Sequence, residues 1–76
     1  MTVRSPAEVF VVCVVGYDDF TVVGVAAEWA DAFGLATASG AGVEVTTEND
    51  KADGDRYFDN IHRPNRRVLV TRRQML

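Results

Sequence analysis

The chain has 76 residues, of which 47% are hydrophobic and 25% are charged, and its formal net charge is −3. A chain this short buries about 60% of its unfolded surface, which limits it to one small core and excludes multidomain enzymes and solenoids. The hydrophobic share excludes a disordered tail, and the apolar run from Val9 to Val15 is too short to cross a bilayer. We therefore expect a single small domain over residues 1–76.

Two runs of β-branched residues follow a polar lead over residues 1–6. Residues 8–15 are typical of a strand, and residues 20–25 form a second run of the same kind. Residues 16–19, between these two runs, are typical of a turn. Gly16 tolerates positive φ, and the side chains of Asp18 and Asp19 can form hydrogen bonds with nearby backbone groups. This pattern predicts an antiparallel hairpin.

The hydrophobic period then changes from that of a strand to that of a helix. Four apolar residues at helical spacing predict a short amphipathic helix over residues 26–33: Ala26, Trp29, Ala30 and Phe33. Gly34 is a candidate left-handed C-cap, although a helix that tolerates an internal glycine would continue to Ala38. A flexible connection over residues 39–42 leads to residues 43–47, whose alternation predicts a strand buried on one side.

Five of the eleven acidic residues fall between Glu48 and Asp59, which predicts a solvated acidic loop at about residues 48–60. Three apolar residues would pin this loop to the body: Tyr57, Phe58 and Ile61. A turn signal at Pro64-Asn65 precedes a last strand over residues 67–71, within a basic C-terminal segment at about residues 63–76. The predicted fold class is α+β, a small β-β-α-β-β sandwich with one helix packed on a mainly antiparallel sheet.

One short helix covers only one face of a sheet. If Val9, Val11, Cys13 and Val15 face the helix, alternation places a second apolar set on the opposite face. That set consists of Phe10, Val12, Val14, Val22 and Leu69. An apolar patch of this kind marks an interaction surface and predicts self-association into a dimer. The alternative is that the segment carrying Tyr57, Phe58 and Ile61 folds over this face.

Charge divides the chain into an acidic body and a basic end. Residues 1–60 contain eleven acids and three bases, a charge of −8, whereas residues 61–76 contain five arginines and no acid, a charge of +5. The acidic part predicts a contact with a protein target through Asp50, Asp53, Asp55, Tyr57 and Phe58. An alternative is a nucleic-acid contact through Arg63, Arg66, Arg67, Arg72 and Arg73, since arginine suits phosphate. The acidic body opposes that alternative by repulsion.

No residue pattern indicates catalysis or a metal site. Cys13, the only cysteine, lies among valines, which predicts core packing and fits a reducing cytoplasm. His62 has no cysteine or second histidine at ligand spacing. Residues 53–55 are similar to the centre of an EF-hand loop, but Lys51 and Asn60 fall where that loop needs ligands. We expect no catalytic residue, no metal and no cofactor.

The hairpin Val9-Phe10-Val11-Val12 with Val22-Val23-Gly24-Val25 precedes an Ala-rich helix containing Glu28 and Ala32. This pattern of valines resembles small uncharacterised β-β-α-β proteins of actinobacteria and their phages over about residues 9–45. An excess of arginine over lysine, seven to one, is typical of the GC-rich coding sequences of such sources. The resemblance implies a non-enzymatic protein-binding module, an inhibitor or regulator in the host cytoplasm. The alternative function is a small nucleic-acid-binding regulator.

Overall fold

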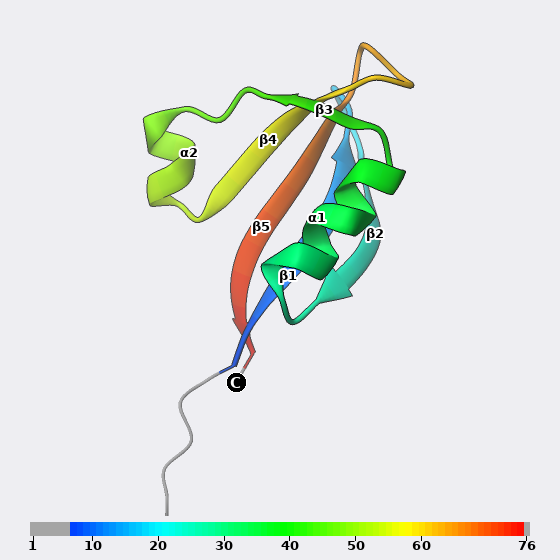
Figure 1. Cartoon of the computed structure of the whole chain (residues 1–76). Helices are drawn as coiled ribbons and strands as arrows, with labels where there is room; N and C mark the ends of the chain where they lie inside the picture. The colour runs from blue at the N-terminus through cyan, green and yellow to red at the C-terminus, as the bar shows by residue number, and fades with distance from the viewer. Residues whose placement is uncertain (1–6, 76) are drawn as a thin grey trace, which may run out of the picture.

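The computed structural model describes residues 7–75, and the predicted polar lead over residues 1–6 lies outside them. Five strands form one antiparallel sheet in the order β2-β1-β5-β4-β3 (Figure 1). The strands are β1 (Ala7–Val15), β2 (Phe20–Ala26), β3 (Ala41–Glu44), β4 (Asp55–Asn60) and β5 (Arg67–Met75). Helix α1 (Trp29–Ala38) lies across one face of the sheet, and the short helix α2 (Glu48–Ala52) lies beside β4. The predicted α+β class is confirmed.

The centre of the sheet is the pairing of β1 with β5. These two strands pair over their whole length, from Ala7 opposite Met75 to Val15 opposite Arg67. On one side, β2 joins β1 through the expected hairpin, whose turn is closed by the Gly16 N–H donating to the Asp19 carbonyl oxygen at 2.8 Å. On the other side β4 pairs with β5, and the short β3 completes the sheet.

The core lies between α1 and the central strands. Val12 of β1 and Val68 and Val70 of β5 are fully buried, and they pack with two small side chains of the helix, Ala32 and Ala36. Alanine at these helix positions lets the backbone of α1 approach the sheet closely. Burying a valine side chain contributes about 1.5–3 kcal/mol, so these strand residues are a main source of stability.

Glycine in β2 makes room for the helix. Gly24 pairs with Val12 and therefore lies on the same face of the sheet. A Cβ atom at this position would lie 3.0 Å from Leu35 Cδ1, so the absence of a side chain lets Leu35 pack down onto β2. The close approach of α1 to the sheet thus depends on small residues on both partners.

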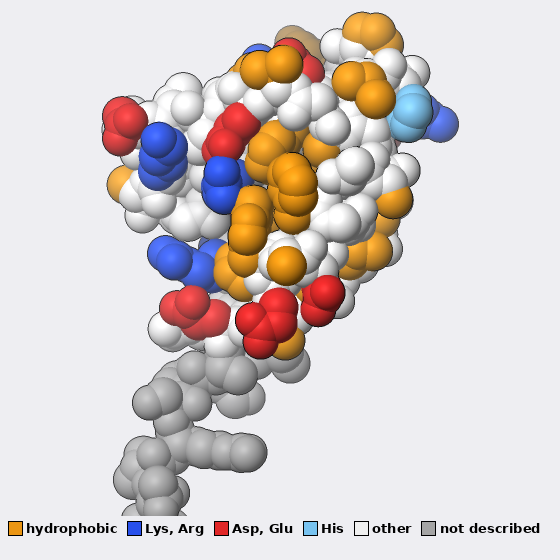
Figure 2. All heavy atoms as spheres, in the orientation of Figure 1, with side chains coloured by type: hydrophobic (Ala, Val, Ile, Leu, Met, Phe, Trp, Pro, Cys, Tyr) orange, Lys and Arg blue, Asp and Glu red, His pale blue; other side chains and the backbone are white. Residues whose placement is uncertain are grey.

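An aromatic row borders the core on the helix side of the sheet. The ring centroids of Phe10 and Trp29 are 5.8 Å apart, those of Trp29 and Phe33 are 5.8 Å apart, and those of Phe33 and Phe58 are 6.0 Å apart. The guanidinium carbon of Arg56 lies 4.3 Å from the Trp29 ring centroid, a cation–π contact. Figure 2 shows hydrophobic side chains gathered at the centre of this face.

Helix α1 begins later than expected and ends at Ala38, the second of the two ends that the sequence left open. Ala26 pairs with Phe10 and so belongs to β2, which delays the helix until Trp29. The predicted C-cap at Gly34 is wrong, because the helix continues through this residue to Ala38. The left-handed residue after the helix is Gly40, with φ of 102°. The apolar face predicted for the helix is also partly wrong, since Ala30, one of its four residues, is exposed.

The segment predicted to be an acidic loop is mostly regular structure. Thr47 and Asp50 form a capping box, in which the Asp50 N–H donates to Thr47 Oγ1 and the Thr47 N–H donates to Asp50 Oδ2, and this box starts α2. Residues 55–60 then form β4, because Arg56 and Phe58 alternate with Tyr57 and pair with β5. β3 spans Ala41–Glu44 rather than residues 43–47.

Two glycines six residues apart, one inside α1 and one just after it, predict opposite effects of substitution by alanine. Gly34 lies inside α1 with open space around it, so Gly34→Ala should stabilise the fold by about 0.5–1 kcal/mol. Gly40 has positive φ, and a Cβ there would lie 2.7 Å from Asn60 Oδ1, so Gly40→Ala should destabilise it by about 1–2 kcal/mol or more. Urea denaturation of both variants measures the difference. Equal effects would contradict the helix end described above.

Candidate functional site

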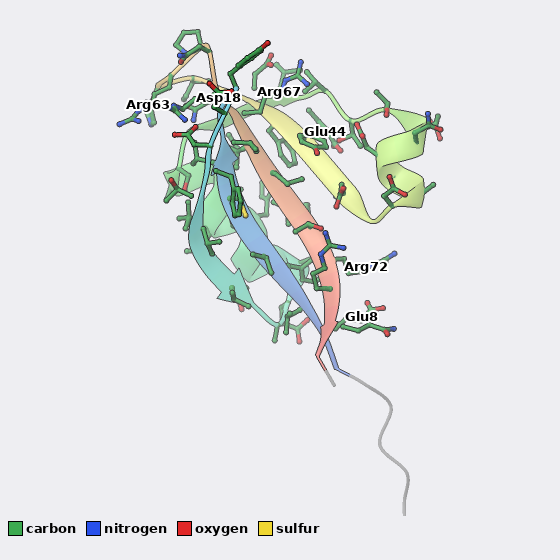
Figure 3. The ribbon with its side chains drawn as sticks, turned by 180° about the vertical axis from the view of Figure 1, so that it is seen from behind. Glu8, Asp18, Glu44, Arg63, Arg67 and Arg72 are labelled. Carbon is green, nitrogen blue, oxygen red and sulfur yellow. The ribbon has the colours of Figure 1, made fainter. Side chains whose placement is uncertain are left out.

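The face of the sheet opposite α1 carries a continuous apolar surface, here called the open face. A shallow hollow of about 330 Å³ on this face is lined by residues of three strands: Val11, Cys13 and Val15 of β1, Phe20 and Val22 of β2, and Leu69, Thr71 and Arg73 of β5. Figure 3 views the sheet from this side, with its side chains in front of the ribbon. Within residues 7–75, α1 packs on the opposite face and α2 packs beside β4, so neither helix covers the hollow.

The apolar side chains of β2 are the most exposed part of the open face. Phe20 is 68% exposed, Val22 52% and Val25 56%. Val25 pairs with Val11, so it extends the same surface along the hairpin. Isolated exposed apolar residues are ordinary on proteins, whereas several neighbouring ones on a small sheet mark an interaction surface.

The structure corrects which residues form this surface. The predicted self-association set does not share one face, because Phe10, Val12 and Val14 point toward the helix side while Val22 and Leu69 lie on the open face. Val12 is fully buried under α1. The physical reason is that α1 covers the even-numbered residues of β1, so the odd-numbered ones are left outside. The alternative cover is also wrong, since the segment carrying Tyr57 and Phe58 joins the sheet as β4.

Cys13 lies at the centre of the open face and is itself buried, as expected for a cysteine among valines. Desolvation by burial raises the pKa of its thiol. A raised pKa leaves little of the nucleophilic thiolate at neutral pH. Cys13 therefore acts as a small apolar side chain in this sheet.

Of the predicted protein-binding residues of the acidic segment, Phe58 is buried, and the other four lie in or next to α2 and β4. Asp50 takes part in the capping box of α2, and Asp55 accepts a hydrogen bond from the Thr71 hydroxyl. Asp53 is exposed at the end of α2. Phe58 is buried in the core, whereas Tyr57, which alternates with it, faces the other way and is half-buried. Burial and the nearby carboxylates of Asp55 and Asp50 raise the Tyr57 pKa, so its hydroxyl keeps its proton.

The five arginines of the alternative nucleic-acid site are divided among four places. Arg63 and Arg66 line a pocket at the hairpin end of the sheet, and Arg73 lines the open face. Arg67 lies beside Tyr57 and Tyr17 near the β4–β5 turn. Arg72 lies at the other end of the molecule, with its Nε 4.0 Å from a carboxylate oxygen of Glu8 (Figure 3). The five side chains therefore form no continuous stripe.

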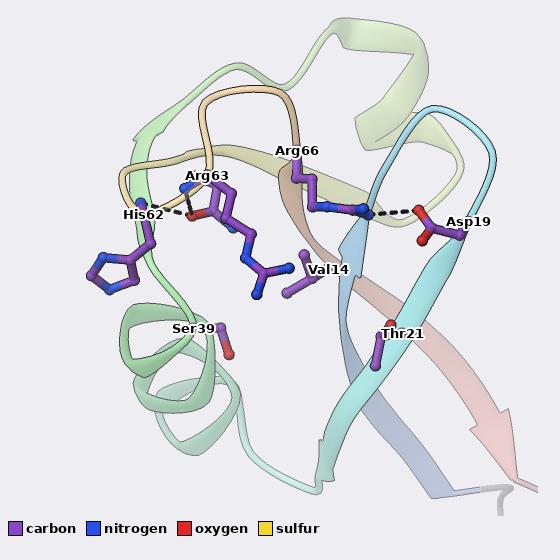
Figure 4. Close-up of a pocket in the computed structure, with 8 residues that line it drawn as sticks. Val14, Asp19, Thr21, Ser39, His62, Arg63 and Arg66 are labelled. Carbon is purple, nitrogen blue, oxygen red and sulfur yellow. Dashed lines mark hydrogen bonds and ion pairs between the residues drawn. The ribbon is translucent and has the colours of Figure 1, made fainter.

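The pocket that holds Arg63 and Arg66, here called the polar pocket, is about 460 Å³ in volume. It is lined by Val14, Asp19, Thr21, Ser39, Asn60, His62, Arg63 and Arg66 (Figure 4). Arg66 Nη1 lies 2.6 Å from Asp19 Oδ1, which joins the β1–β2 turn to the β4–β5 turn. Sequence reasoning did not bring these residues together, because they come from three segments far apart in the chain, the β1–β2 hairpin, the end of α1 and residues 60–66.

Buried Asn60 shapes the turn that carries the two arginines. It is 5% exposed, and its Oδ1 accepts hydrogen bonds from the backbone N–H groups of His62 and Arg63, both at 2.9 Å. The Arg66 N–H then donates to the Arg63 carbonyl oxygen at 2.9 Å, which closes the expected turn at Pro64. The direction in which Arg63 and Arg66 leave the turn is thus set by a buried amide.

A second polar pair lies on the helix side and was not singled out in the sequence. Arg56 donates to both carboxylate oxygens of Glu44, with Nε at 2.9 Å and Nη2 at 2.6 Å. These hydrogen bonds, and a further one from Thr46, lower the pKa of Glu44 to about 2. The pair fixes Arg56 over the Trp29 ring and ties β3 to β4.

The described residues show neither a metal cluster nor a membrane-spanning helix. Within residues 7–75, no group of three or more His, Cys, Asp or Glu side chains could hold a metal ion. None of the helices in the same range is both long enough and apolar enough to cross a membrane. The open face and the polar pocket are the two candidate sites in this part of the chain.

The Glu44–Arg56 pair predicts a specific contribution to acid stability. The folded pKa of Glu44, about 2, lies below its ordinary value of 4.5, so this stabilisation is present above pH 4.5 and is lost as the pH falls toward 2. Glu44→Gln should reduce the slope of the free energy of unfolding against pH in this window. The reduction should correspond to at most one bound proton per molecule. Arg56→Gln should have the same effect. Urea denaturation at several pH values tests this, and unchanged slopes in both variants would contradict it.

Cys13 predicts a protected thiol. In the native protein at neutral pH, a chromogenic disulfide reagent should modify Cys13 at least about tenfold more slowly than in the urea-denatured protein, because the thiol is buried and its pKa is raised. Equal rates would show that β1 is accessible or that the thiolate is activated.

Comparisons with known proteins add no relative. The chain matches no protein-family model, no curated protein and no solved structure. Its resemblance to small proteins of actinobacteria and their phages stays a prediction.

Proposed function

We propose that this protein is a non-enzymatic protein-binding module that self-associates through its open face. The observation that carries the proposal is the group of exposed apolar side chains on β2, next to the apolar residues of β1 and to Leu69. The occupant of the open face is a second copy of the chain.

The energetics favour covering this surface. Fully burying a valine or phenylalanine side chain is worth about 1.5–3 kcal/mol, so covering Phe20, Val22 and Val25 supplies a substantial driving force. A domain of 76 residues has a small free energy of unfolding. Association that buries apolar surface increases this free energy, because only the folded chain associates.

Charge explains why a second copy suits the open face. A two-fold interface brings the same patch of both subunits together, so a charged patch would meet its own sign. The open-face residues of β1 and β2 in the hollow are all apolar: Val11, Cys13, Val15, Phe20 and Val22. The charged residue of the hollow, Arg73, lies on the neighbouring strand β5. Placing β1 and β2 of one protomer over β2 and β1 of its partner leaves Arg73 at the rim.

This packing is one that sheets commonly adopt. Two sheets stacked face to face align within about 30° and enclose a core about 10 Å thick. The dimer would then be a sandwich with α1 on each outer surface, so both faces of each sheet would be covered. The predicted contact of the acidic segment with a further protein target is compatible with this arrangement, because α2 packs beside β4 rather than on β1 or β2.

The alternative function, a nucleic-acid-binding regulator, has less support in the geometry. A site that follows a nucleic-acid backbone needs neighbouring cations along one surface, whereas the five arginines are divided among four places and only Arg63 and Arg66 share one. A reducing compartment would keep the free Cys13 as a thiol. This is consistent with an inhibitory or regulatory role in the cytoplasm, which for a phage protein would be the cytoplasm of its host.

Oligomeric state tests the proposal directly. Light scattering at micromolar concentrations should give at least twice the chain mass of 8.3 kDa. Val22→Asp should dissociate the dimer, because it places a charge in the apolar contact. Val43→Asp is the matched control, since Val43 is also exposed but lies on β3, at the opposite edge of the sheet, and this variant should remain dimeric.

Two results would overturn self-association. One is a monomer across the whole concentration range in the unmodified protein. The other is equal dissociation by the Val22 and Val43 variants, which would point to net charge rather than to the open face. Circular dichroism of each variant separates dissociation from unfolding, and Val12→Asp provides the unfolded reference because Val12 is in the core.

A further inference from the structure

The polar pocket is independent of the open face. Val14 and Thr21 form its sheet wall on the helix side, and Ser39 at the end of α1 forms the opposite wall (Figure 4). We propose that this pocket binds a small phosphate monoester, whose phosphate is held by Arg63 and Arg66. The argument rests on the two guanidinium groups, on the Asp19 carboxylate and on the size of the cavity.

Arg63 supplies a cation that is directed into the pocket and has not been neutralised. Figure 4 shows its guanidinium pointing into the cavity, between Ser39 and Val14. Within the described part of the chain, this guanidinium has no hydrogen-bond or ion-pair partner. Arginine presents several N–H donors in a planar fork that matches phosphate oxygens.

Asp19 already shows how an anion can lie against Arg66. A single carboxylate oxygen of Asp19 lies 2.6 Å from Arg66 Nη1, and the Asp19 side chain is 60% exposed. An ion pair this exposed contributes little, about 0–1 kcal/mol, so an incoming anion can displace it. Figure 4 shows the Arg66 guanidinium directed toward Asp19, so a phosphate held by both arginines requires Arg66 to turn from Asp19 toward Arg63.

The end of α1 does not prevent anion binding. The carbonyl end of a helix carries partial negative charge, which disfavours an anion. Here three of the last four carbonyl groups accept hydrogen bonds: Leu35 O from the N–H and hydroxyl of Ser39, Ala36 O from the Ser39 N–H, and Thr37 O from the Gly40 N–H. The hydroxyl of Ser39 is therefore used within the helix end, and the arginines are the phosphate donors.

The cavity is larger than a phosphate ion requires. Its volume of about 460 Å³ lies within the range of about 300–1,000 Å³ that is usual for small-molecule sites. Val14 provides an apolar surface, and Thr21 and Asn60 provide polar ones, for the organic part of the ligand. These features favour a phosphorylated small molecule over the bare ion.

Amide chemical shifts of the full chain, titrated with inorganic phosphate and with the four ribonucleoside 5′-monophosphates, test the site. Both kinds of probe should shift the amides of residues 60–66, and at least one monophosphate should bind more tightly than phosphate. The corresponding nucleosides should cause no shift, because they lack the phosphate. Shifts caused equally by the nucleosides, or no shift with any phosphate-containing probe, would overturn the proposal.

Substitutions then separate this pocket from general charge attraction. Arg63→Gln should weaken monophosphate binding by about tenfold, the usual value of a charge-assisted hydrogen-bonded pair. Asp19→Asn should strengthen it several-fold, since Arg66 loses its competing carboxylate. Arg73→Gln, which removes the same charge from the open face, should have no effect.

Three outcomes of this set would overturn the site. One is an equal loss of binding in Arg73→Gln and Arg63→Gln, which would indicate diffuse charge attraction. Weaker binding by Asp19→Asn would show that Asp19 holds Arg66 in place for the ligand or the fold. Equally tight binding of a short oligonucleotide without a terminal phosphate would favour the nucleic-acid function over a monoester site. Unfolding curves of each variant identify any loss that comes from a damaged fold.

Discussion

The long antiparallel pairing of β1 with β5 is the constraint on which the rest of this structure depends. It joins the two ends of the described chain, from Ala7 opposite Met75 to Val15 opposite Arg67, and places both strands at the centre of the sheet. Because side chains alternate along a strand, the pairing divides the apolar residues of β1 and β5 between two faces. One face takes α1, and the other carries the exposed residues of β2 and the apolar hollow.

The choice of face follows from the residues that allow close packing. Ala32 and Ala36 on α1 and Gly24 on β2 together bring the helix down onto Val12. The aromatic row and the Glu44–Arg56 pair then close the side of this layer next to β4. No comparable set of small and aromatic residues on a second helix is present within residues 7–75, which is why the open face is the candidate contact surface.

The two candidate sites occupy different parts of the molecule and require different chemistry. The open face is apolar where β1 and β2 meet, so it suits a second copy of the same surface. The polar pocket gathers two arginines and one carboxylate at the hairpin end, on the helix side of the sheet. Since they share none of their lining residues, binding at one site leaves the other accessible, and each proposal can fail without the other.

Local patterns in the sequence determined the hairpin, the α+β class and the buried state of Cys13. The β-branched runs and the turn at Gly16 depend on neighbours in the chain, and the structure confirms them. The capping box of Thr47 with Asp50 is also local, and it was missed because the density of acids suggested a solvated loop. Recognising that box, and the alternation that begins at Arg56, would have predicted α2 and β4.

Only the tertiary structure decided which face of β1 is covered. Alternation predicts two faces but assigns neither, because the odd-numbered and even-numbered residues of β1 are both apolar. The assignment came from the packing of Ala32 and Ala36 on Val12, a contact between segments far apart in the chain. The same reason applies to the polar pocket: Asp19 and Arg66 are 47 residues apart, and no local pattern links them.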